Sequence, residues 1–258
     1  MLPIIQIGPL ALPAPGLAII AGIWIGLTVS ERYARRFEVD PNQLYNLVFI
    51  ALMAGIISAR LAYAVRFPAA FAASPISLLS RDLNLLDPWG GIAVGGLAAL
   101  VYGQRKGMDL WSTMDALTPG LAVLGVAWGL ANLASGNAYG TPTQLPWGIE
   151  LWGAHRHPTQ IYQTLLALII LVVILPGTSL IRMQLSGGRF LIFVALSAGA
   201  RLFLESFRGD SVLILGGIRL AQVLAWLVLA GSLWGLARLH DRQRTTQPAV
   251  DRGKSAAG

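Results

Sequence analysis

Three charged side chains stand at helical spacing in an apolar stretch of the sequence: Arg201, Glu205 and Arg208. The preceding residues, Phe190 to Ala200, carry no charge. The i, i+4, i+7 spacing predicts that all three project from one side of a helix. Ionisable groups inside a membrane helix are costly and usually mark a site. Two cations around one carboxylate would suit an anionic lipid headgroup; the alternative is a helix end whose charges reach the membrane interface.

A second polar group opens another apolar stretch. Arg156 and His157 precede Pro158 and Thr159, a pair typical of a helix start, where an anion also binds well. His157 is a candidate proton acceptor or an ordinary interface histidine. Asn132 lies deep in a further apolar stretch, and an unsatisfied amide in hydrocarbon costs several kcal/mol. We therefore expect Asn132 to make an interhelical hydrogen bond or to contact a ligand.

More ionisable residues fall inside apolar stretches than ordinary membrane helices contain. They comprise three arginines and two acids: Arg60, Arg201, Arg219, Glu205 and Asp115. A bundle interior with this excess of cations favours a phosphate or carboxylate ligand. Asp115 is expected to cap its own helix or to pair with Arg105 or Lys106.

Composition identifies the class of protein. Of 258 residues, 55% are hydrophobic and only 12% are charged, and the mean hydropathy is +0.64, so we predict an integral membrane protein. The absence of cysteine excludes a thiol nucleophile, a disulfide and a thiolate metal site in this chain. The three histidines have no zinc-site spacing, so we expect no metal and no cofactor. The net charge of +7 is better explained by cytoplasmic loops on anionic lipid than by nucleic acid.

Seven apolar stretches approach the length that a bilayer requires. They cover approximately Pro15–Ser30, Tyr45–Val65, Trp89–Gly103, Ser112–Gly136, Thr159–Leu175, Arg189–Phe207 and Leu213–Leu236. The fold predicted is therefore an all-α, seven-transmembrane-helix bundle. Phe67–Leu79 is apolar but interrupted by prolines, and we expect an interfacial or re-entrant segment there.

Lysine and arginine counts predict the orientation of the bundle. With the N-terminus outside, twelve of the 19 basic residues fall in inside loops and the tail, four in outside loops and three in spans. The prediction is N-out and C-in. Residues 1–240 form the membrane domain, and residues 241–258 a short basic cytoplasmic tail that we expect to be disordered.

Glycines recur four residues apart in two of the predicted spans. Gly91 and Gly95 form one such pair, and Gly125 and Gly129 form another. Small residues at this spacing let helix backbones approach closely. We interpret both pairs as helix-packing positions.

Together these motifs resemble the prolipoprotein diacylglyceryl transferase family. The resemblance rests on an ordered set that follows Ile7-Gly-Pro-Leu-Ala-Leu12: Asp115-Ala-Leu-Thr-Pro119, Leu130-Ala-Asn132-x3-Gly136, Arg156-His-Pro-x-Gln-x-Tyr162, Arg201-x3-Glu205-x2-Arg208 and Gln222. Each motif alone is weak, whereas the ordered set is fairly specific. The resemblance implies a seven-helix bundle in the bacterial plasma (inner) membrane, N-out and C-in.

The resemblance also implies a reaction and its residues. A member of this family moves diacylglyceryl from phosphatidylglycerol to the lipobox cysteine of a prolipoprotein and releases glycerol phosphate. The partners implied are that lipid and that prolipoprotein, with no cofactor and no nucleic acid. The site residues implied comprise two catalytic and five phospholipid-binding positions: His157 and Glu205 for catalysis; Arg201, Arg208, Asn132, Gly136 and Arg156 for the lipid.

Four positions depart from the pattern of that family. Trp89 stands where the family has histidine, Gly129 where it has arginine, Asn137 where it has an acid, and Pro15 where it has tyrosine. Tryptophan cannot exchange a proton as imidazole does, and glycine supplies no cation. Two functions follow: a diacylglyceryl transferase, or a catalytically impaired homologue that binds anionic phospholipid as a non-enzymatic or scaffold protein. A transporter is not favoured, because the sequence shows no inverted repeat or pore-like polar stripe.

Overall fold

The structure is a computed structural model that describes residues 4–7, 10–80, 85–177, 185–214 and 216–255. Arg81 and Arg182, which entered the loop charge count, lie outside these residues, as do Gly8 and Pro9 of the first motif. The chain divides into two compact units. Unit 1 contains residues 1–30 and 114–258, and unit 2 contains residues 31–113.

The described residues are predominantly helical, with seven long helices and one short helix. The helices are α1 (Ala14–Ala34), α2 (Pro41–Arg66), α3 (Pro68–Ala73), α4 (Pro88–Arg105), α5 (Leu110–Ser135), α6 (Thr159–Ile174), α7 (Gly188–Glu205) and α8 (Leu220–Ser255). Four segments are long and apolar enough to cross a membrane: Ala14–Phe37, Pro41–Arg66, Leu110–Ser135 and Leu220–Asp241. α6 is a shorter apolar helix.

Each of the seven predicted apolar stretches corresponds to one long helix. The last stretch was predicted to begin at Leu213, and that boundary is wrong. Residues Leu213–Ile214 (β5) and Ile218–Arg219 (β6) pair as an antiparallel hairpin, and α8 begins only at Leu220. Gly216 and Gly217 turn this hairpin with positive φ angles of 80° and 134°, a conformation that hydrophobicity alone does not predict. Arg219 consequently lies in β6 and not inside a span.

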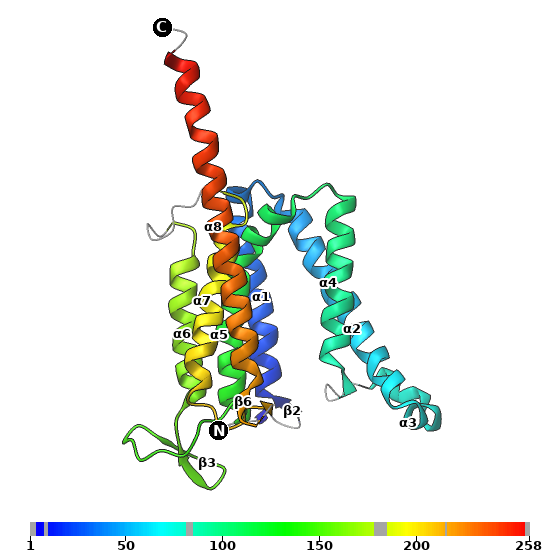
Figure 1. Cartoon of the computed structure of the whole chain (residues 1–258). Helices are drawn as coiled ribbons and strands as arrows, with labels where there is room; N and C mark the ends of the chain where they lie inside the picture. The colour runs from blue at the N-terminus through cyan, green and yellow to red at the C-terminus, as the bar shows by residue number, and fades with distance from the viewer. Residues whose placement is uncertain (1–3, 8–9, 81–84, 178–184, 215, 256–258) are drawn as a thin grey trace. The chain divides into compact units, whose positions relative to one another are not determined.

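In unit 1, α1, α5, α6, α7 and α8 run side by side (Figure 1). Three short hairpins lie at the same end of this unit: β1 (Ile4–Ile7) with β2 (Leu10–Pro13), β3 (Ile149–Leu151) with β4 (Ala154–Arg156), and β5 with β6. The loops and helix ends at this end of the unit contain most of the predicted site residues.

Small residues set the distance between helices in unit 1. A methyl group at Gly26 would lie 2.8 Å from the Gly120 carbonyl oxygen, so α1 and α5 approach backbone to backbone. Ser30 Oγ accepts a hydrogen bond from the Gly120 amide at 3.1 Å and donates one to the Leu117 carbonyl at 3.4 Å. These contacts satisfy polar groups beside Pro119, which breaks the regular hydrogen-bond ladder of α5.

Unit 2 consists mainly of α2 packed against α4, with α3 and a 3₁₀ turn (Pro75–Leu79) between them in sequence. The prediction that Gly91 and Gly95 serve helix packing is confirmed. A methyl group at Gly95 would lie 2.7 Å from the Ala51 carbonyl, and one at Gly91 would lie 3.0 Å from the Gly55 carbonyl. α3 has only six residues, so Phe67–Leu79 does not form a further membrane-length helix.

The backbone of α8 continues beyond residue 241 to Ser255. Disorder of this tail, as predicted from the sequence, stays a prediction. The division into a membrane domain and a separate tail stays a prediction.

Candidate active site at the ends of α5, α6 and α7

Two side chains at the start of α6 donate hydrogen bonds to the loop that follows α5, and two further hydrogen bonds fix the end of α5 itself. The Gly136 amide donates to the Asn132 carbonyl at 2.9 Å, and Gly136 ends α5 with a φ of 77°. Gln160 Nε2 donates to the Asn137 carbonyl at 2.9 Å, and Thr159 Oγ1 donates to the Ala138 carbonyl at 2.5 Å. The Trp152 indole reaches over from the β3–β4 hairpin and donates to the Gly136 carbonyl at 3.2 Å.

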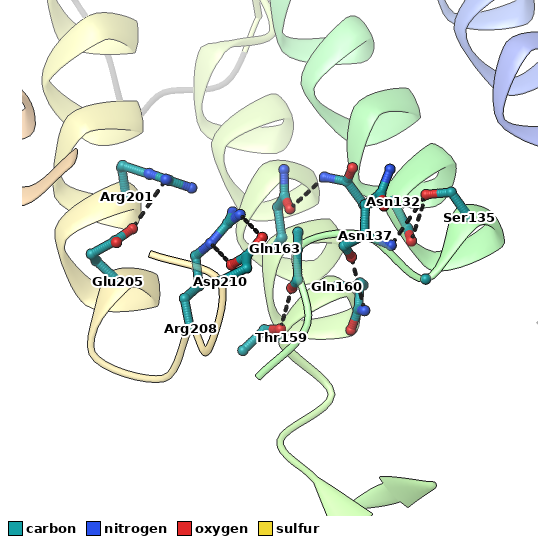
Figure 2. A network of polar contacts seen from close by, with 12 residues as sticks. Asn132, Ser135, Asn137, Thr159, Gln160, Gln163, Arg201, Glu205, Arg208 and Asp210 are labelled. Carbon is teal, nitrogen blue, oxygen red and sulfur yellow. Dashed lines mark hydrogen bonds and ion pairs between the residues drawn. The ribbon is translucent and has the colours of Figure 1, made fainter. Parts of the chain in front are cut away.

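Asn132 makes the interhelical contact that its depth required. Its Nδ2 donates to Gln163 Oε1 on α6 at 3.1 Å, as Figure 2 shows. Of the two alternatives that the sequence left open, the interhelical hydrogen bond is therefore present. It places Asn132 and Gln163 on facing sides of α5 and α6.

Gly129 stands one turn before Asn132 and brings the same two helices together. A methyl group at Gly129 would lie 2.5 Å from Thr164 Oγ1 and 3.0 Å from the Thr164 Cα. At Gly125 the nearest atom would be 3.9 Å away, on Ala167. The packing interpretation is thus confirmed at Gly129 but not at Gly125, where the neighbouring helix leaves room.

Arg156 binds backbone carbonyls of the loops around it. Its Nε donates to the Leu151 carbonyl at 3.0 Å, and its Nη1 donates to the Gly140 carbonyl at 3.2 Å. Its guanidinium also lies over the Tyr139 ring, 5.0 Å from the centroid. Arg156 therefore holds the β3–β4 hairpin against the loop that follows α5.

The same loop holds the chain that leaves α7. The Thr141 amide donates to the Phe207 carbonyl at 2.8 Å, and the Gly209 amide donates to the Tyr139 carbonyl at 2.9 Å. Gly140 and Arg208 pair as an isolated antiparallel bridge. These backbone contacts bring the loop after α5 and the loop after α7 together.

The charged triplet is divided between two structural elements. Arg201 and Glu205 lie on α7, and Nη2 of the arginine is 3.0 Å from Oε2 of the glutamate, which is completely buried. α7 ends at Glu205, so Arg208 belongs to the following loop. The expectation that all three project from one helix face is wrong, because the bridge to Gly140 draws Arg208 away from the helical path.

Arg208 pairs with Asp210 and not with Glu205. Its Nε and Nη2 donate to the two carboxylate oxygens of Asp210 at 2.9 and 2.7 Å, a bidentate ion pair. Arg201 lies within electrostatic range of Arg208, Glu205 and Asp210. The cluster thus contains two cations and two carboxylates, and the predicted net positive charge is wrong because the sequence reasoning omitted Asp210.

His157 lies between the two loops. Its amide donates to the Thr141 carbonyl at 3.1 Å, and its ring packs edge-on against Phe207 and Tyr162 at centroid distances of 5.3 and 6.4 Å. Nδ1 is buried without a hydrogen-bond partner. A neutral imidazole has one nitrogen that accepts and one that donates, so this buried ring still has unused hydrogen-bonding capacity at Nδ1.

Figure 2 includes side chains that were not among the predicted site residues, among them Asp210, Gln160 and Gln163. Gln160 is completely buried at the start of α6, and its Oε1 has no hydrogen-bond partner. A buried amide near a helix start was visible in the sequence as part of the Arg156–Tyr162 motif. Asp210 gave a weaker signal, because an acid two residues after an arginine in a loop is common.

Asp115 takes neither of its predicted partners. Its two oxygens accept hydrogen bonds from the backbone amides of Gly187 and Phe190, each at 2.7 Å. Asp115 therefore caps the N-terminus of α7, a helix more than seventy residues further along the chain. The sequence could not reveal this partner because the contact depends on how α5 packs against α7.

Arg60 and Trp89, which also entered the sequence argument, lie in unit 2. Arg60 on α2 donates hydrogen bonds to the Ser80 carbonyl and, at 3.0 Å, to the Leu85 carbonyl. Its guanidinium therefore binds backbone groups between α2 and α4 in the same unit. Trp89 lies in the first turn of α4, where its amide donates to Asp87 Oδ1 at 2.9 Å. Within the part of the chain that the structure describes, no group of three or more His, Asp or Glu side chains could hold a metal ion.

Comparison with known proteins identifies the family. Residues 3–238 match the family model described as prolipoprotein diacylglyceryl transferase. The chain is 32% identical to the phosphatidylglycerol–prolipoprotein diacylglyceryl transferase of Synechococcus elongatus, over 96% of this chain and 90% of the relative. It is 30% identical to the enzyme of that name from Nostoc sp., over 97% and 93%, and 32% identical to the one from Thermosynechococcus vestitus, over 92% and 91%.

These matches extend over nearly the whole chain, so they include α5, α6, α7 and the loops that join them. The ordered motifs, the helical architecture and the sequence matches agree. The chain belongs to the prolipoprotein diacylglyceryl transferase family.

Proposed function

We propose that this protein is a membrane transferase that moves diacylglyceryl from phosphatidylglycerol to the lipobox cysteine of a prolipoprotein. Family membership over residues 3–238 supports the reaction class. The observation that carries the proposal is the convergence of His157, the Arg201–Glu205 pair and the Arg208–Asp210 pair at one end of α5, α6 and α7. Transfer to a thiol needs a group that accepts the thiol proton and cations that bind the phosphate, and these residues supply both.

The two arginines bind the phosphate of the lipid. Arg201 keeps 39% of its side-chain surface exposed, so its outer face can meet an incoming phosphate while Glu205 fixes its position. Arg208 is held by Asp210 through two hydrogen bonds, which orient the remaining edge of its guanidinium. Fixed guanidinium groups stabilise the charge that develops on a leaving phosphate without reorganising during the reaction.

The transfer step forms a carbon–sulfur bond and breaks a carbon–oxygen bond. The acceptor thiol loses its proton to His157 Nδ1, and the sulfur attacks the glycerol carbon that carries the phosphodiester. The electron pair of the broken bond leaves on the phosphate oxygen, and the proton returns from His157 to the departing glycerol phosphate. A thiol of pKa about 8.5 needs only modest help to ionise near neutral pH.

Asn132, Gly136 and Arg156 serve the lipid site by shaping its walls. Asn132 fixes α6 through Gln163, Gly136 ends α5 at the site, and Arg156 holds the neighbouring loop through carbonyls. The proposed setting is the bacterial plasma membrane, with seven membrane-spanning helices, N-out and C-in. This orientation places the site at the outer leaflet, where the acceptor cysteine of an exported prolipoprotein arrives.

The test is transfer by the purified chain from radiolabelled phosphatidylglycerol to a synthetic lipobox peptide. We expect a thioether-linked diacylglyceryl peptide and one glycerol phosphate for each peptide modified. Complementation of a strain depleted of its own diacylglyceryl transferase provides the test in cells. Both activities should be lost on Arg201→Ala and kept on Arg238→Ala, an arginine about half-way along α8 that lies over Trp234.

A chain that gives no product and no rescue, yet still retains phosphatidylglycerol in native mass spectrometry, would overturn the transferase proposal. That result would favour the non-enzymatic lipid-binding protein. The family comparisons do not favour this alternative, because the matched relatives carry the names of enzymes.

A further inference from the structure

The β5–β6 hairpin follows directly from the loop that carries Arg208 and Asp210. Leu213 of β5 is opposite Arg219 of β6, and a hydrogen bond of 3.0 Å from the Leu220 amide to the Val212 carbonyl extends the ladder by one residue. Ser211 lies two residues before Leu213. Because side chains alternate along a strand, Ser211 and Arg219 leave the hairpin on the same face, as diagonal neighbours.

Both of these side chains contain a buried polar atom without a partner. Arg219 Nη1 and Ser211 Oγ are each shielded from solvent and make no hydrogen bond. In the described part of the chain Arg219 forms no ion pair, in contrast to Arg201 and Arg208, which are paired with carboxylates. A buried charged donor without an acceptor costs more than a neutral one, so this pair is suited to an acceptor that the chain itself does not supply.

We propose that Ser211 and Arg219 form an anion-binding subsite that takes a phosphate-ester oxygen. The guanidinium supplies charge and directed donors, and the serine hydroxyl supplies one further donor beside it. The subsite is distinct from the Arg201 and Arg208 pairs because it uses a separate hairpin and an arginine without a carboxylate partner. This inference goes beyond the proposed transfer reaction, since it concerns a phosphate bound at a position other than the Arg201 and Arg208 site.

The position of the hairpin favours a phosphate over other anions. The membrane-length segment of α8 begins at Leu220, the residue after Arg219. A span that begins there would put the guanidinium near the level of the phospholipid phosphates. The hairpin also exposes apolar side chains, with Val212, Leu213 and Ile218 exposed by 65%, 61% and 49%. An arginine among exposed apolar residues at a helix start is the arrangement expected beside a lipid headgroup.

The phosphate could be part of a phospholipid or of a small soluble ester, and two binding measurements separate these sources. One is native mass spectrometry of the full chain with phosphatidylglycerol against phosphatidylcholine. The other is calorimetry of the detergent-solubilised chain with glycerol 1-phosphate. The variants are Arg219→Gln and Ser211→Ala, with Arg238→Gln as the matched loss of one charge on α8.

We expect Arg219→Gln to weaken the binding of phosphatidylglycerol or of glycerol 1-phosphate by about tenfold or more, because a charge-assisted hydrogen bond is lost. Arg238→Gln should leave the binding of both probes unchanged. Weaker binding of phosphatidylglycerol in native mass spectrometry identifies the ligand as a phospholipid. Weaker binding of glycerol 1-phosphate in calorimetry identifies it as a released soluble ester. Unchanged binding in both arms overturns the subsite. Should Arg219→Gln fail to fold, Ser211→Ala decides: a fall of about threefold or more supports the subsite, and a smaller change overturns it. Neither arm requires an acceptor peptide, so a chain without transfer activity still tests this inference.

Discussion

Glu205 Oε2 lies 3.0 Å from Arg201 Nη2, and the glutamate is completely buried while the arginine side chain is partly exposed. The pair is asymmetric: the carboxylate is enclosed among helices, and the guanidinium has one face available to a ligand. A buried partner restricts the motion of the exposed one. We therefore propose that Glu205 acts by positioning Arg201, whereas the resemblance to the family implied a catalytic role for it.

Replacing Glu205 by glutamine should lower the transfer rate by about tenfold or more, because a neutral amide holds the guanidinium less firmly than a carboxylate does. The rate with saturating phosphatidylglycerol and lipobox peptide measures this effect. Glu150→Gln is the matched control, since Glu150 is 78% exposed and only approaches His155 at 3.5 Å. Equal rates for the wild type and Glu205→Gln would contradict the positioning role.

Replacing His157 by phenylalanine should reduce transfer by about a hundredfold or more while leaving lipid binding within twofold. The aromatic contacts with Phe207 and Tyr162 can persist, but the proton-accepting nitrogen is lost. His240→Phe, at an exposed position on α8, provides the control. If His157→Phe kept the wild-type rate, another group would have to accept the thiol proton.

The two glycines of the Gly125–Gly129 pair should respond differently to alanine. At Gly129 the new methyl group would meet Thr164 Oγ1 at 2.5 Å and its Cα at 3.0 Å, so α5 and α6 must separate. We expect Gly129→Ala to destabilise the protein by about 1–3 kcal/mol, the range for overpacking. Gly125→Ala has 3.9 Å of clearance and should be neutral or slightly stabilising.

Thermal unfolding in detergent measures both glycine variants. A melting temperature for Gly129→Ala equal to that of Gly125→Ala would show that α5 and α6 can separate at no cost. The Asn132–Gln163 hydrogen bond lies one turn further along the same interface, so transfer should also fall in Gly129→Ala.

Removing the Asp115 carboxylate should destabilise α7. Asp115→Ala leaves the amides of Gly187 and Phe190 without their acceptor, at a cost of about 1–2 kcal/mol or more because the site is buried. Asp115→Asn retains one acceptor oxygen and should lose less. The control is Asp109→Asn, whose cap on the Ser112 amide is exposed, so water can replace it. A smaller loss for Asp115→Ala than for Asp109→Asn would contradict this role.

The helices were largely predictable because hydrophobicity over about twenty residues is a local property. Seven predicted stretches match seven long helices, and the prediction failed where glycine conformation decided the outcome, at the Gly216–Gly217 hairpin turn. The site was predictable by residue type and only partly by arrangement. Arg201 and Glu205 interact across one helical turn as expected, and Asn132 makes the predicted interhelical bond.

The sequence by itself determined the class of protein, the positions of the apolar helices and the family motifs, because composition and spacing need no knowledge of which helices touch. Tertiary structure alone decided the partners: Asp210 for Arg208, the start of α7 for Asp115, and backbone carbonyls for Arg156. These pairings depend on which loops meet at the end of α5, α6 and α7. Local spacing carries no information about contacts between residues far apart in the chain, and that is why the partners of Asp115 and Arg156 became visible only in three dimensions.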